Sequence, residues 1–531
     1  MRFNTVNNGS MQIKNYEGEK TFRLDPAMEL YTAVVTWSVS DSFYEKDNDR
    51  LLRVRKLIAE NDPLFVAKLA VYTRYKMYMR SAPLVLLTEL ARVHSGDDLV
   101  SKATAKVIAR ADEITELLAC YQVLNKRKGF KKLGGLSKQL QKGLSTAFNR
   151  FDEYQFAKYN RPAEIRLRDA LFMVHPKPKD EAQQHLFNKI ADDRLETPYT
   201  WETELSALGQ VSYECDAEKE AAFKAKWEEL IDSGKLGHMA TLRNLRNMLE
   251  AGVSHPHIRK VADQLSAPEK VANAKQFPFR YLAAYRELLS LPTGKSGLSE
   301  KLKSFFTGSD GYVGELLEAL EKAVVQSASV IAGFDENTRI LLACDISGSM
   351  QKPVSPKSKV LLYDVGLMLA MLLQSRCRNV RVGMFGDTWK LIPVPKNNVL
   401  ANVQEFYRRE GEVGYSTNGF LVIEDLLKQK VVMDKVMLFT DCQLWNSMTG
   451  TKNIYALWLE YKRTVAPDAR LYLFDLMGYG RPPVQIIQNE VYLLAGWSDK
   501  IFGVLDALEN GGKALDEIER IDIASCSPGF L

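Results

Sequence analysis

The sequence predicts a mixed fold, in which an α-helical array of HEAT-like repeats is followed by an α/β Rossmann-like domain. The 531 residues are too many for one hydrophobic core, so two or three domains are expected. From Asp25 onwards, apolar residues recur at positions i, i+3, i+4 and i+7, the pattern of helices with one buried face. After Thr338, short apolar runs alternate with helical segments, which predicts a parallel sheet covered on both faces.

The helical region begins at Asp25-Pro26, where Asp25 suits an N-cap and Pro26 the first helical position. Pairing of the helices at a spacing of roughly 40 residues indicates a solenoid of HEAT type. Self-similarity along the region is weak, so a helical domain without repeats is the alternative. The predicted helices are Ala27–Val39, Asp49–Glu60, Asp62–Met79, Ala82–Val93, Leu99–Ala109, Asp112–Leu124, Glu181–Asp193, Ala217–Ser233, His238–Ala251, His255–Leu265, Phe279–Leu289, Ser299–Phe305 and Gly314–Val330.

The α/β region alternates strands and helices over about 170 residues, a length that suits one domain. Its predicted strands are Arg339–Asp345, Val380–Phe385, Leu391–Val394, Val436–Asp441, Leu471–Leu476 and Val491–Leu494. Its predicted helices are Lys357–Gln374, Leu400–Arg408, Gly419–Lys428, Ile454–Val465 and Ile501–Glu509. We therefore divide the chain into a helical domain (1–335), an α/β domain (336–510) and a C-terminal tail (511–531) that either packs on the helices or extends from them.

Side chains with carboxylate or hydroxyl oxygens lie in three separate segments at the predicted edge of the sheet. Asp345, Ser347 and Ser349 follow the first strand, Thr417 lies in the loop GYSTNGF before a helix, and Asp441 ends the strand VMLFTD. Because the carboxyl ends of parallel strands meet at one edge, these groups can converge on one cation. Carboxylates and hydroxyls suit Mg²⁺, which retains water and needs few protein ligands. D-x-S-x-S alone is also a common turn signature, so the prediction depends on the complete set.

Positive charge is concentrated in the helical region. Residues 101–150 hold 11 Lys and Arg against 3 acidic residues, and a basic face of this kind indicates a polyanion partner such as RNA. A solvated loop and helix face is the alternative. The first basic stretch comprises Lys126, Arg127, Lys128, Lys131, Lys132, Lys138 and Lys142. In the second, Lys158, Arg161, Arg166, Arg168 and His175 stand among aromatic side chains, a mixture that can stack on unpaired bases.

Composition excludes several classes of protein. The polar N-terminus has no apolar core of a secretory signal, and no window of about 20 residues is free of charge, so no membrane span is predicted. The 6 cysteines are far apart and form no C-x-x-C pair, which favours reduced thiols and a cytoplasmic protein. Neither a dinucleotide-binding G-x-G-x-x-G after the first strand nor a P-loop occurs.

The ordered set DISGS, the threonine of GYSTNG and the aspartate of LFTDCQ resembles the metal-ion-dependent adhesion site of von Willebrand factor A domains. The helical region contains LDPAMELYTAVV (24–35), DPLFVAKLAVYTR (62–74), KYNRPAEIRLRDALFMVHPKP (158–178) and LRNLRNML (242–249). With these stretches, the chain resembles a bacterial member of the Ro autoantigen family, the proteins with a TROVE module.

This resemblance implies a monomeric ring of HEAT-like repeats closed by an A domain, without catalysis of its own. It implies binding of small noncoding Y RNA on the outer basic surface, with Lys158 and His175 at contact positions beside Arg161, Arg166 and Arg168. It also implies capture of single-stranded ends of misfolded RNA in the central hole, where Arg243, Arg246 and Arg280 are candidate contacts. Roles in RNA quality control, processing or stress survival, with an exoribonuclease as partner, follow from the same resemblance.

Two other functions stay open at this point. In the first, the protein is a metal-dependent scaffold, in which the open cation position takes a carboxylate of a partner protein. In the second, it is a nuclease in which Asp345 and Asp441 hold Mg²⁺ to activate water. The nuclease hypothesis is the weaker one, because most candidate ligands are hydroxyls and the sequence offers no candidate general base near them.

Overall fold

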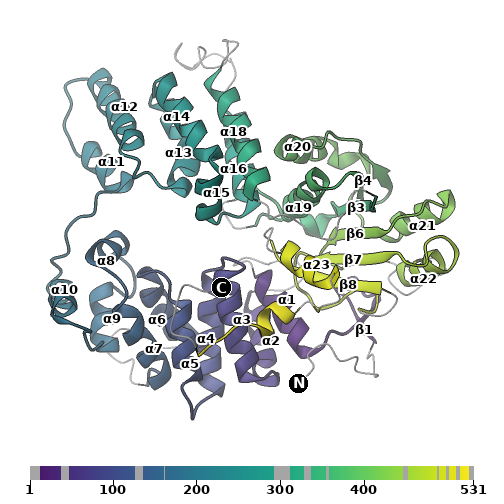
Figure 1. The fold of residues 1–531 in the computed structure, drawn as a ribbon, viewed down its shortest axis with the longest axis horizontal. Coiled ribbons are helices and arrows are strands. Elements are labelled where there is room, and N and C mark those ends of the chain that lie inside the picture. The colour runs from purple at the N-terminus through teal and green to yellow at the C-terminus, as the bar shows by residue number, and fades with distance from the viewer. Residues whose placement is uncertain are drawn as a thin grey trace.

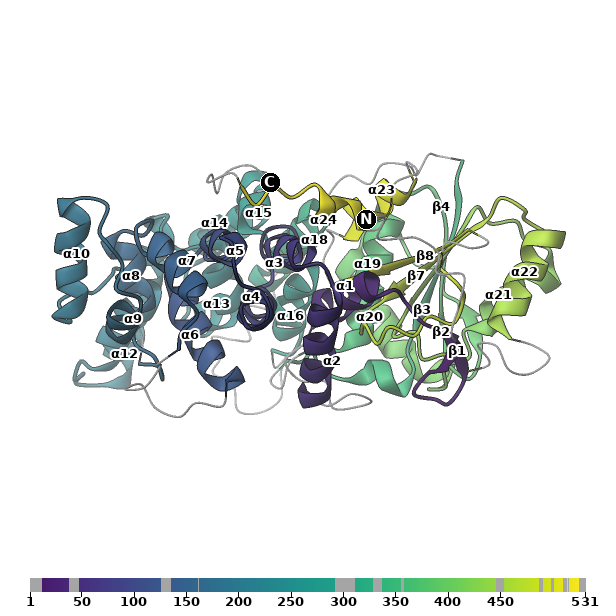
Figure 2. The ribbon, with the colours of Figure 1, turned by 90° about the horizontal axis from the view of Figure 1, so that it is seen from below.

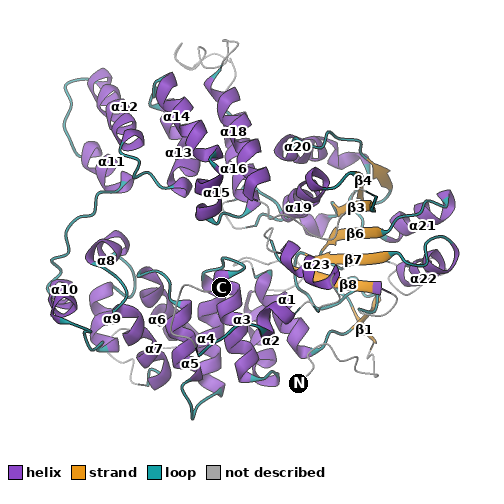
Figure 3. Ribbon diagram, in the orientation of Figure 1, coloured by secondary structure: helices purple, strands orange, loops and turns teal. Residues whose placement is uncertain are grey.

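The computed structural model describes residues 12–37, 47–125, 135–160, 162–291, 311–327, 337–354, 358–445, 453–486, 490–497, 501–509, 513 and 515–524. Its helices form two arms that extend from opposite sides of an α/β domain (Figure 1), and the main sheet belongs to that domain (Figure 3). In the view from below the arms overlap, with the α/β domain at one end (Figure 2). The predicted mixed fold is confirmed. No helix in this part of the chain is long and apolar enough to cross a membrane.

The described residues of the first arm form ten helices, which follow a short β-hairpin of β1 (Gln12–Lys14) and β2 (Lys20–Phe22). Asp25 caps the first of them by accepting hydrogen bonds from the backbone N–H groups of Ala27 and Met28, as the sequence predicted. The helices are α1 (Pro26–Val35), α2 (Asp47–Glu60), α3 (Pro63–Tyr75), α4 (Ser81–Val93), α5 (Leu99–Val107), α6 (Asp112–Leu124), α7 (Lys138–Phe148), α8 (Glu153–Tyr159), α9 (Leu167–Val174) and α10 (Glu181–Ala191). Neighbours pack in pairs, such as α3 on α4 and α5 on α7.

The second arm is joined to the first by residues 192–200 (Figure 1). Its described helices are α11 (Trp201–Gly209), α12 (Asp216–Asp232), α13 (His238–Glu250), α14 (His255–Ser266), α15 (Pro268–Ala274), α16 (Pro278–Leu289) and α18 (Tyr312–Ser327). The predicted helix Ser299–Phe305 lies outside the described residues, as does most of the boundary near residue 335. The division of the chain at that residue therefore stays a prediction.

The α/β domain is built on a six-stranded sheet in the order β5-β4-β3-β6-β7-β8. The strands are β3 (Arg339–Asp345), β4 (Asn379–Phe385), β5 (Trp389–Leu391), β6 (Lys435–Thr440), β7 (Arg470–Asp475) and β8 (Val491–Ala495). All neighbours are parallel except β4 and β5, so the prediction of a parallel strand at Leu391–Val394 was wrong. Only residues 386–388 join β4 to β5, and a connection this short permits only an antiparallel hairpin.

The helices of the α/β domain match their predicted positions closely. They are α19 (Leu362–Arg376), α20 (Val399–Arg409), α21 (Phe420–Gln429), α22 (Ile454–Thr464) and α23 (Ile501–Glu509). The buried helix α19 packs on β3, β4 and β6, and its start is five residues later than predicted. Beyond this domain, the described part of the tail forms α24 (Asp516–Glu519), which packs on α3 of the first arm.

Both arms contact the α/β domain, and the chain thereby closes into a ring. On the side of the first arm, α1 packs on β8, and the buried Arg50 of α2 donates hydrogen bonds to the carbonyl oxygens of Thr36 and Met477. On the side of the second arm, α16 packs on α19 and α20. There, Arg286 forms a bidentate ion pair with the fully buried Asp364, with N–O distances of 2.6 and 2.7 Å.

The ion pair at the second seam predicts the effect of Asp364→Asn. Removing one partner leaves the Arg286 charge without its counter-ion in a buried site, which costs about 3–5 kcal/mol. We expect a loss of that size in urea unfolding, with faster hydrogen exchange in α16 and α19. The exposed pair of Glu318 and Lys322 provides the control, since Lys322→Ala should cost less than about 1 kcal/mol. An equally small effect of both substitutions would contradict this role for the ion pair.

Candidate cation site and central cavity

The candidate cation residues lie together at the carboxyl edge of the sheet. Asp345, Ser347, Ser349, Thr417 and Asp441 are all buried, with exposed fractions of 0–4%. The hydroxyl oxygens of Ser347 and Ser349 are 3.2 Å apart. The backbone N–H of Ser347 donates to Oδ1 of Asp345 over 2.9 Å, so the turn positions its own first carboxylate. The five residues that the sequence predicted at one edge of the sheet therefore form one cluster.

Hydrogen bonds between the three loops fix this cluster. The backbone N–H of Gly348 donates to the carbonyl of Tyr415 (3.1 Å), which joins the first loop to that of Thr417. The backbone N–H of Trp445 donates to Oγ1 of Thr417 over 3.2 Å and joins it to the loop after β6. Across the strands, the hydroxyl of Thr440 donates to Oδ2 of Asp345 over 2.6 Å. The loops therefore hold the oxygen ligands in fixed relative positions.

The electrostatics of the cluster fit a divalent cation. Burial raises the pKa of Asp345, and the negative charge of Asp441 raises it further. Burial also raises the pKa of Asp441, whose Oδ2 atom has no hydrogen-bond partner among the described residues. Two buried carboxylates at close range repel each other unless a proton or cation lies between them. No group of three or more His, Cys, Asp or Glu suited to a metal occurs in the described ranges.

Asp475 is a further acidic residue at this edge that the sequence analysis did not select. It ends β7, is 1% exposed, and accepts hydrogen bonds from the backbone N–H groups of Met477 and Gly478. Burial raises the pKa of Asp475 to about 6, a shift that Asp441 increases and the positive charge of Arg50 reduces. Its position at the end of the strand LYLFD was the available signal, since it pairs in register with Thr440, the residue before Asp441.

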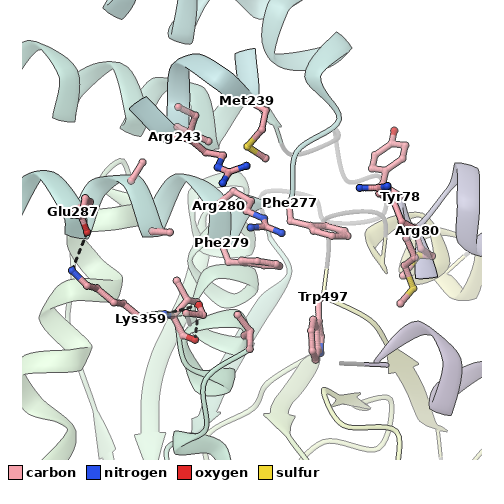
Figure 4. A pocket seen from close by; sticks show the side chains of 18 of the residues that line it. Tyr78, Arg80, Met239, Arg243, Phe277, Phe279, Arg280, Glu287, Lys359 and Trp497 are labelled. Atoms are coloured by element: carbon pink, nitrogen blue, oxygen red, sulfur yellow. Dashed lines mark hydrogen bonds and ion pairs between the residues drawn. The ribbon is translucent and has the colours of Figure 1, made fainter. Parts of the chain in front are cut away.

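A cavity of about 850 Å³ lies where both arms meet the α/β domain. Two of its three predicted arginines, Arg243 of α13 and Arg280 of α16, extend into it (Figure 4). Burial lowers the pKa of Arg280, and the like charge of Arg243 lowers it further. Arg246 also lines the cavity, but Glu250 and Glu287 neutralise it through contacts of 2.7 Å. Arg243 and Arg280 are therefore the better candidates for binding an anion.

Aromatic side chains from distant parts of the chain also line the cavity (Figure 4). Phe277 and Phe279 come from the start of α16, Tyr78 from the loop after α3, and Trp497 from the end of β8. The guanidinium of Arg280 lies 5.5 Å from the centre of the Phe279 ring. This combination of flat apolar rings and cations suits unpaired nucleotides, which stack and carry phosphate. The sequence analysis missed these aromatic residues, because only the ring brings them together.

The described part of the predicted outer RNA surface is exposed. Gln141 of α7 donates to the carbonyl of Val174 at the end of α9, so the basic face of α7 lies beside His175. Lys158 lies within 6 Å of the rings of Tyr154 and Tyr159, at 5.7 and 5.8 Å. The exposed residues are Lys138, Lys142, Lys158, Arg166, Arg168 and His175. The predicted contacts Lys126, Arg127, Lys128, Lys131, Lys132 and Arg161 lie outside the described residues.

A helical ring closed by a von Willebrand factor A-type domain defines a class of protein, and comparison with known sequences identifies the family. A model of the TROVE domain matches residues 30–199 and 191–293, and a model of the Ro60 vWA domain matches residues 339–481. The chain belongs to the Ro family, whose TROVE-containing members are RNA-binding proteins.

Individual relatives agree with this assignment. Telomerase protein component 1 of Mus musculus is 26% identical over 313 residues, which cover 44% of this chain and 11% of that protein. The protein of the same name from Rattus norvegicus is 35% identical over 130 residues, covering 24% and 4%. The chain thus spans only about a tenth or less of the length of these two relatives. The crystal structure of the Deinococcus radiodurans Ro (RSR) protein covers 92% of this chain and 100% of its own, at 16% identity and a TM-score of 0.56, and shows the same fold.

The buried carboxylate of Asp475 predicts a pH-dependent effect of Asp475→Asn. Because its pKa in the folded protein is about 6, above that of an unfolded chain, its ionisation destabilises the folded state as pH rises between about 4 and 6. Relative to the parent protein, the melting temperature of the variant should therefore rise over this range and level off above it. Melting is measured in EDTA, with the exposed Asp468→Asn as a control for charge. If the melting temperature of the variant fell relative to that of the parent protein as pH rises, the prediction would be contradicted.

Proposed function

We propose that this chain is a ring protein of RNA metabolism without catalysis of its own. It captures unpaired ends of misfolded or structured RNA in the central cavity and holds a small Y-type RNA on the outer face of the first arm. It acts in RNA quality control, processing or stress survival together with an exoribonuclease. The observation that carries the proposal is the cavity in which Arg243 and Arg280 lie among aromatic rings.

Size and chemistry support selection of unpaired strands in the cavity. Its lining comes from both arms and from the α/β domain, so an RNA must enter a ring of protein rather than lie on an open surface. A duplex is too wide for such a site, while a single strand exposes bases to Phe277, Phe279 and Trp497 and phosphates to the arginines. Selection for misfolding then needs no base sequence, only a free single-stranded end.

The outer face supports binding of a structured RNA. Lys138, Lys142, Lys158, Arg166 and Arg168 are exposed on neighbouring elements of the first arm, where side chains can follow a phosphate backbone. Such contacts release counterions and depend steeply on salt. His175 adds a ring at the left-handed residue after α9, in position to stack on a base. This surface and the cavity are separate, so one RNA can be bound while another is examined.

We also propose that the cluster at the sheet edge holds Mg²⁺. Ser347, Ser349 and Thr417 would contribute hydroxyl oxygens, and Asp345 and Asp441 would act directly or through water. When bound, the cation would neutralise the repulsion between the two buried carboxylates. The unpaired Oδ2 atom of Asp441 and the pKa values raised by burial support this assignment.

The two RNA surfaces predict separate effects of two pairs of substitutions. Arg243→Ala with Arg280→Ala should weaken binding of a single-stranded oligonucleotide by roughly 10-fold or more and reduce the salt slope by about 1.4, since each charge contributes about 0.7 for single strands. Lys158→Ala with His175→Ala should instead weaken binding of a Y-RNA-like stem-loop. Affinities are measured by fluorescence anisotropy at several salt concentrations.

Each pair of substitutions is the matched control for the other, because each leaves the opposite surface intact. If both variants lost affinity for the oligonucleotide and for the stem-loop to the same extent, the proposal of two separate RNA sites would be contradicted. The same samples test for catalysis, since labelled RNA should remain intact in Mg²⁺. Cleavage that disappears in Asp345→Ala would overturn the proposal in favour of a Mg²⁺-dependent nuclease.

The cation proposal predicts that Mg²⁺ stabilises the folded protein. A ligand at 100 times its dissociation constant adds about 2.7 kcal/mol, and Asp441→Asn should remove most of this gain. Because the carboxylates must lose their protons to bind the cation, the gain should be larger at pH 8 than at pH 5.5. Melting temperatures with and without Mg²⁺ test both points, with Ca²⁺ as a comparison of ion size. A gain that is unchanged in Asp441→Asn would place the cation elsewhere.

A further inference from the structure

We propose that Glu17, at the tip of the β1–β2 hairpin, is an internal ligand of the cation site. Its carboxylate would occupy the outward coordination position, which would otherwise be left for an oxygen of a partner protein or water. The inference depends on the cation site proposed above and adds a ligand from a segment more than 300 residues away in the chain. It makes the site self-capped, so an external acidic partner must first displace the hairpin.

The hairpin tip is bonded directly to the loop that follows Asp441. The side-chain amide of the buried Asn15 donates to the carbonyl of Leu444 over 3.0 Å, and the backbone N–H of Tyr16 donates to Oε1 of Gln443 over 2.8 Å. Asn15 also closes the tip itself, because its Oδ1 accepts from the backbone N–H of Glu19 over 2.8 Å. The tip is therefore fixed in both conformation and position before any ligand binds.

Trp445 links Glu17 to the candidate ligand Thr417. The indole Nε1 of Trp445 donates to Oε2 of Glu17 over 2.8 Å. The backbone N–H of the same tryptophan donates to Thr417, at 3.1 Å to the carbonyl oxygen and 3.2 Å to Oγ1. A single residue thus orients both groups, as second-shell partners do in metal sites. The charge of Glu17 also acts on Asp441, whose pKa it raises.

The other side of the tip packs on the loop after β7. The rings of Tyr16 and Tyr479 meet edge-on with centres 5.2 Å apart, and the guanidinium of Arg481 lies 4.0 Å from the centre of the Tyr16 ring. At the base of the hairpin, the backbone N–H of Phe22 donates to the carbonyl of Pro482 over 3.2 Å. The hairpin therefore contacts both the loop after β6 and the loop after β7.

The negative charges of the carboxylates near the hairpin tip favour a bound cation. The half-buried Glu17 brings a further carboxylate towards the buried Asp441, and the like charges repel. Lys352 offsets part of this repulsion, since its charge lowers the pKa of Asp441, and its ammonium donates to the hydroxyl of Tyr479 over 3.0 Å. A divalent cation would balance the remaining charge and would bind the hairpin to the site more tightly.

The experiment counts the water molecules on a bound probe ion. Eu³⁺ replaces Mg²⁺ in the full-length protein, and luminescence lifetimes in H₂O and D₂O give the number of coordinated waters. Glu17→Gln should increase that number by about one, since one ligand position passes to solvent, and should weaken Mg²⁺ binding several-fold. Glu19→Gln is the matched control, with the same change of charge two residues along the same hairpin. Its water count should equal that of the parent protein.

Hydrogen exchange gives a second measurement. Mg²⁺ should slow exchange in residues 12–22 of the parent protein and of Glu19→Gln, and this protection should be lost in Glu17→Gln. Equal water counts and equal protection in all three proteins would overturn the role of Glu17, while leaving the cation site intact. If the parent protein and Asp441→Asn bind the probe ion equally, the cation site itself is overturned. The two failures are thus distinguishable.

Discussion

The bidentate ion pair between Arg286 and Asp364 joins the second arm to the α/β domain and so helps to close the ring. Burial raises the pKa of Asp364 although Arg286 opposes that shift, whereas Asp364 raises the pKa of Arg286 although burial opposes it. Buried ion pairs of this kind fix geometry more than they add stability. The carboxylate also accepts the backbone N–H of Leu361 over 2.7 Å, which leaves it one orientation. Since Arg286 lies on α16, the same contact fixes Phe279 and Arg280 of that helix against the cavity.

The first arm is held to the α/β domain by different means. Arg50 is fully buried and bonds to backbone carbonyls on both sides of the seam. Gly478 has a φ of +63°, and a Cβ there would lie 2.2 Å from the carbonyl oxygen of Thr32. The close approach of α1 to the loop after β7 therefore requires glycine at this position. The first arm is therefore held by close backbone contacts and by the buried guanidinium of Arg50, which require the two surfaces to fit closely. The second arm is held by the ion pair of Arg286 and Asp364.

The sequence was sufficient for features that follow from local pattern and from the rules of parallel sheets. Asp345 and Asp441 could be placed together because strand ends share an edge, although nothing local indicated Glu17, whose approach depends on packing across most of the chain. Helix α7 was not among the predicted helices, although Leu140 and Leu144 have helical spacing and are buried, because the stretch was interpreted by its lysines, as a polyanion-binding cluster or a solvated loop and helix face. The aromatic lining of the cavity was missed for the same reason as Glu17, since ring closure creates it.

The candidate cation residues and part of the cavity wall belong to the same edge of one sheet. The segment after β3 carries Ser347 and Ser349 and continues to Val354 and Val360, which line the cavity, while Trp497 follows β8 at the same edge. The backbone N–H of Val354 donates to the carbonyl of Val360 over 3.0 Å, so the ends of this segment are tied together. The segment after β3 therefore carries two of the candidate cation ligands and also contributes Val354 and Val360 to the lining of the cavity.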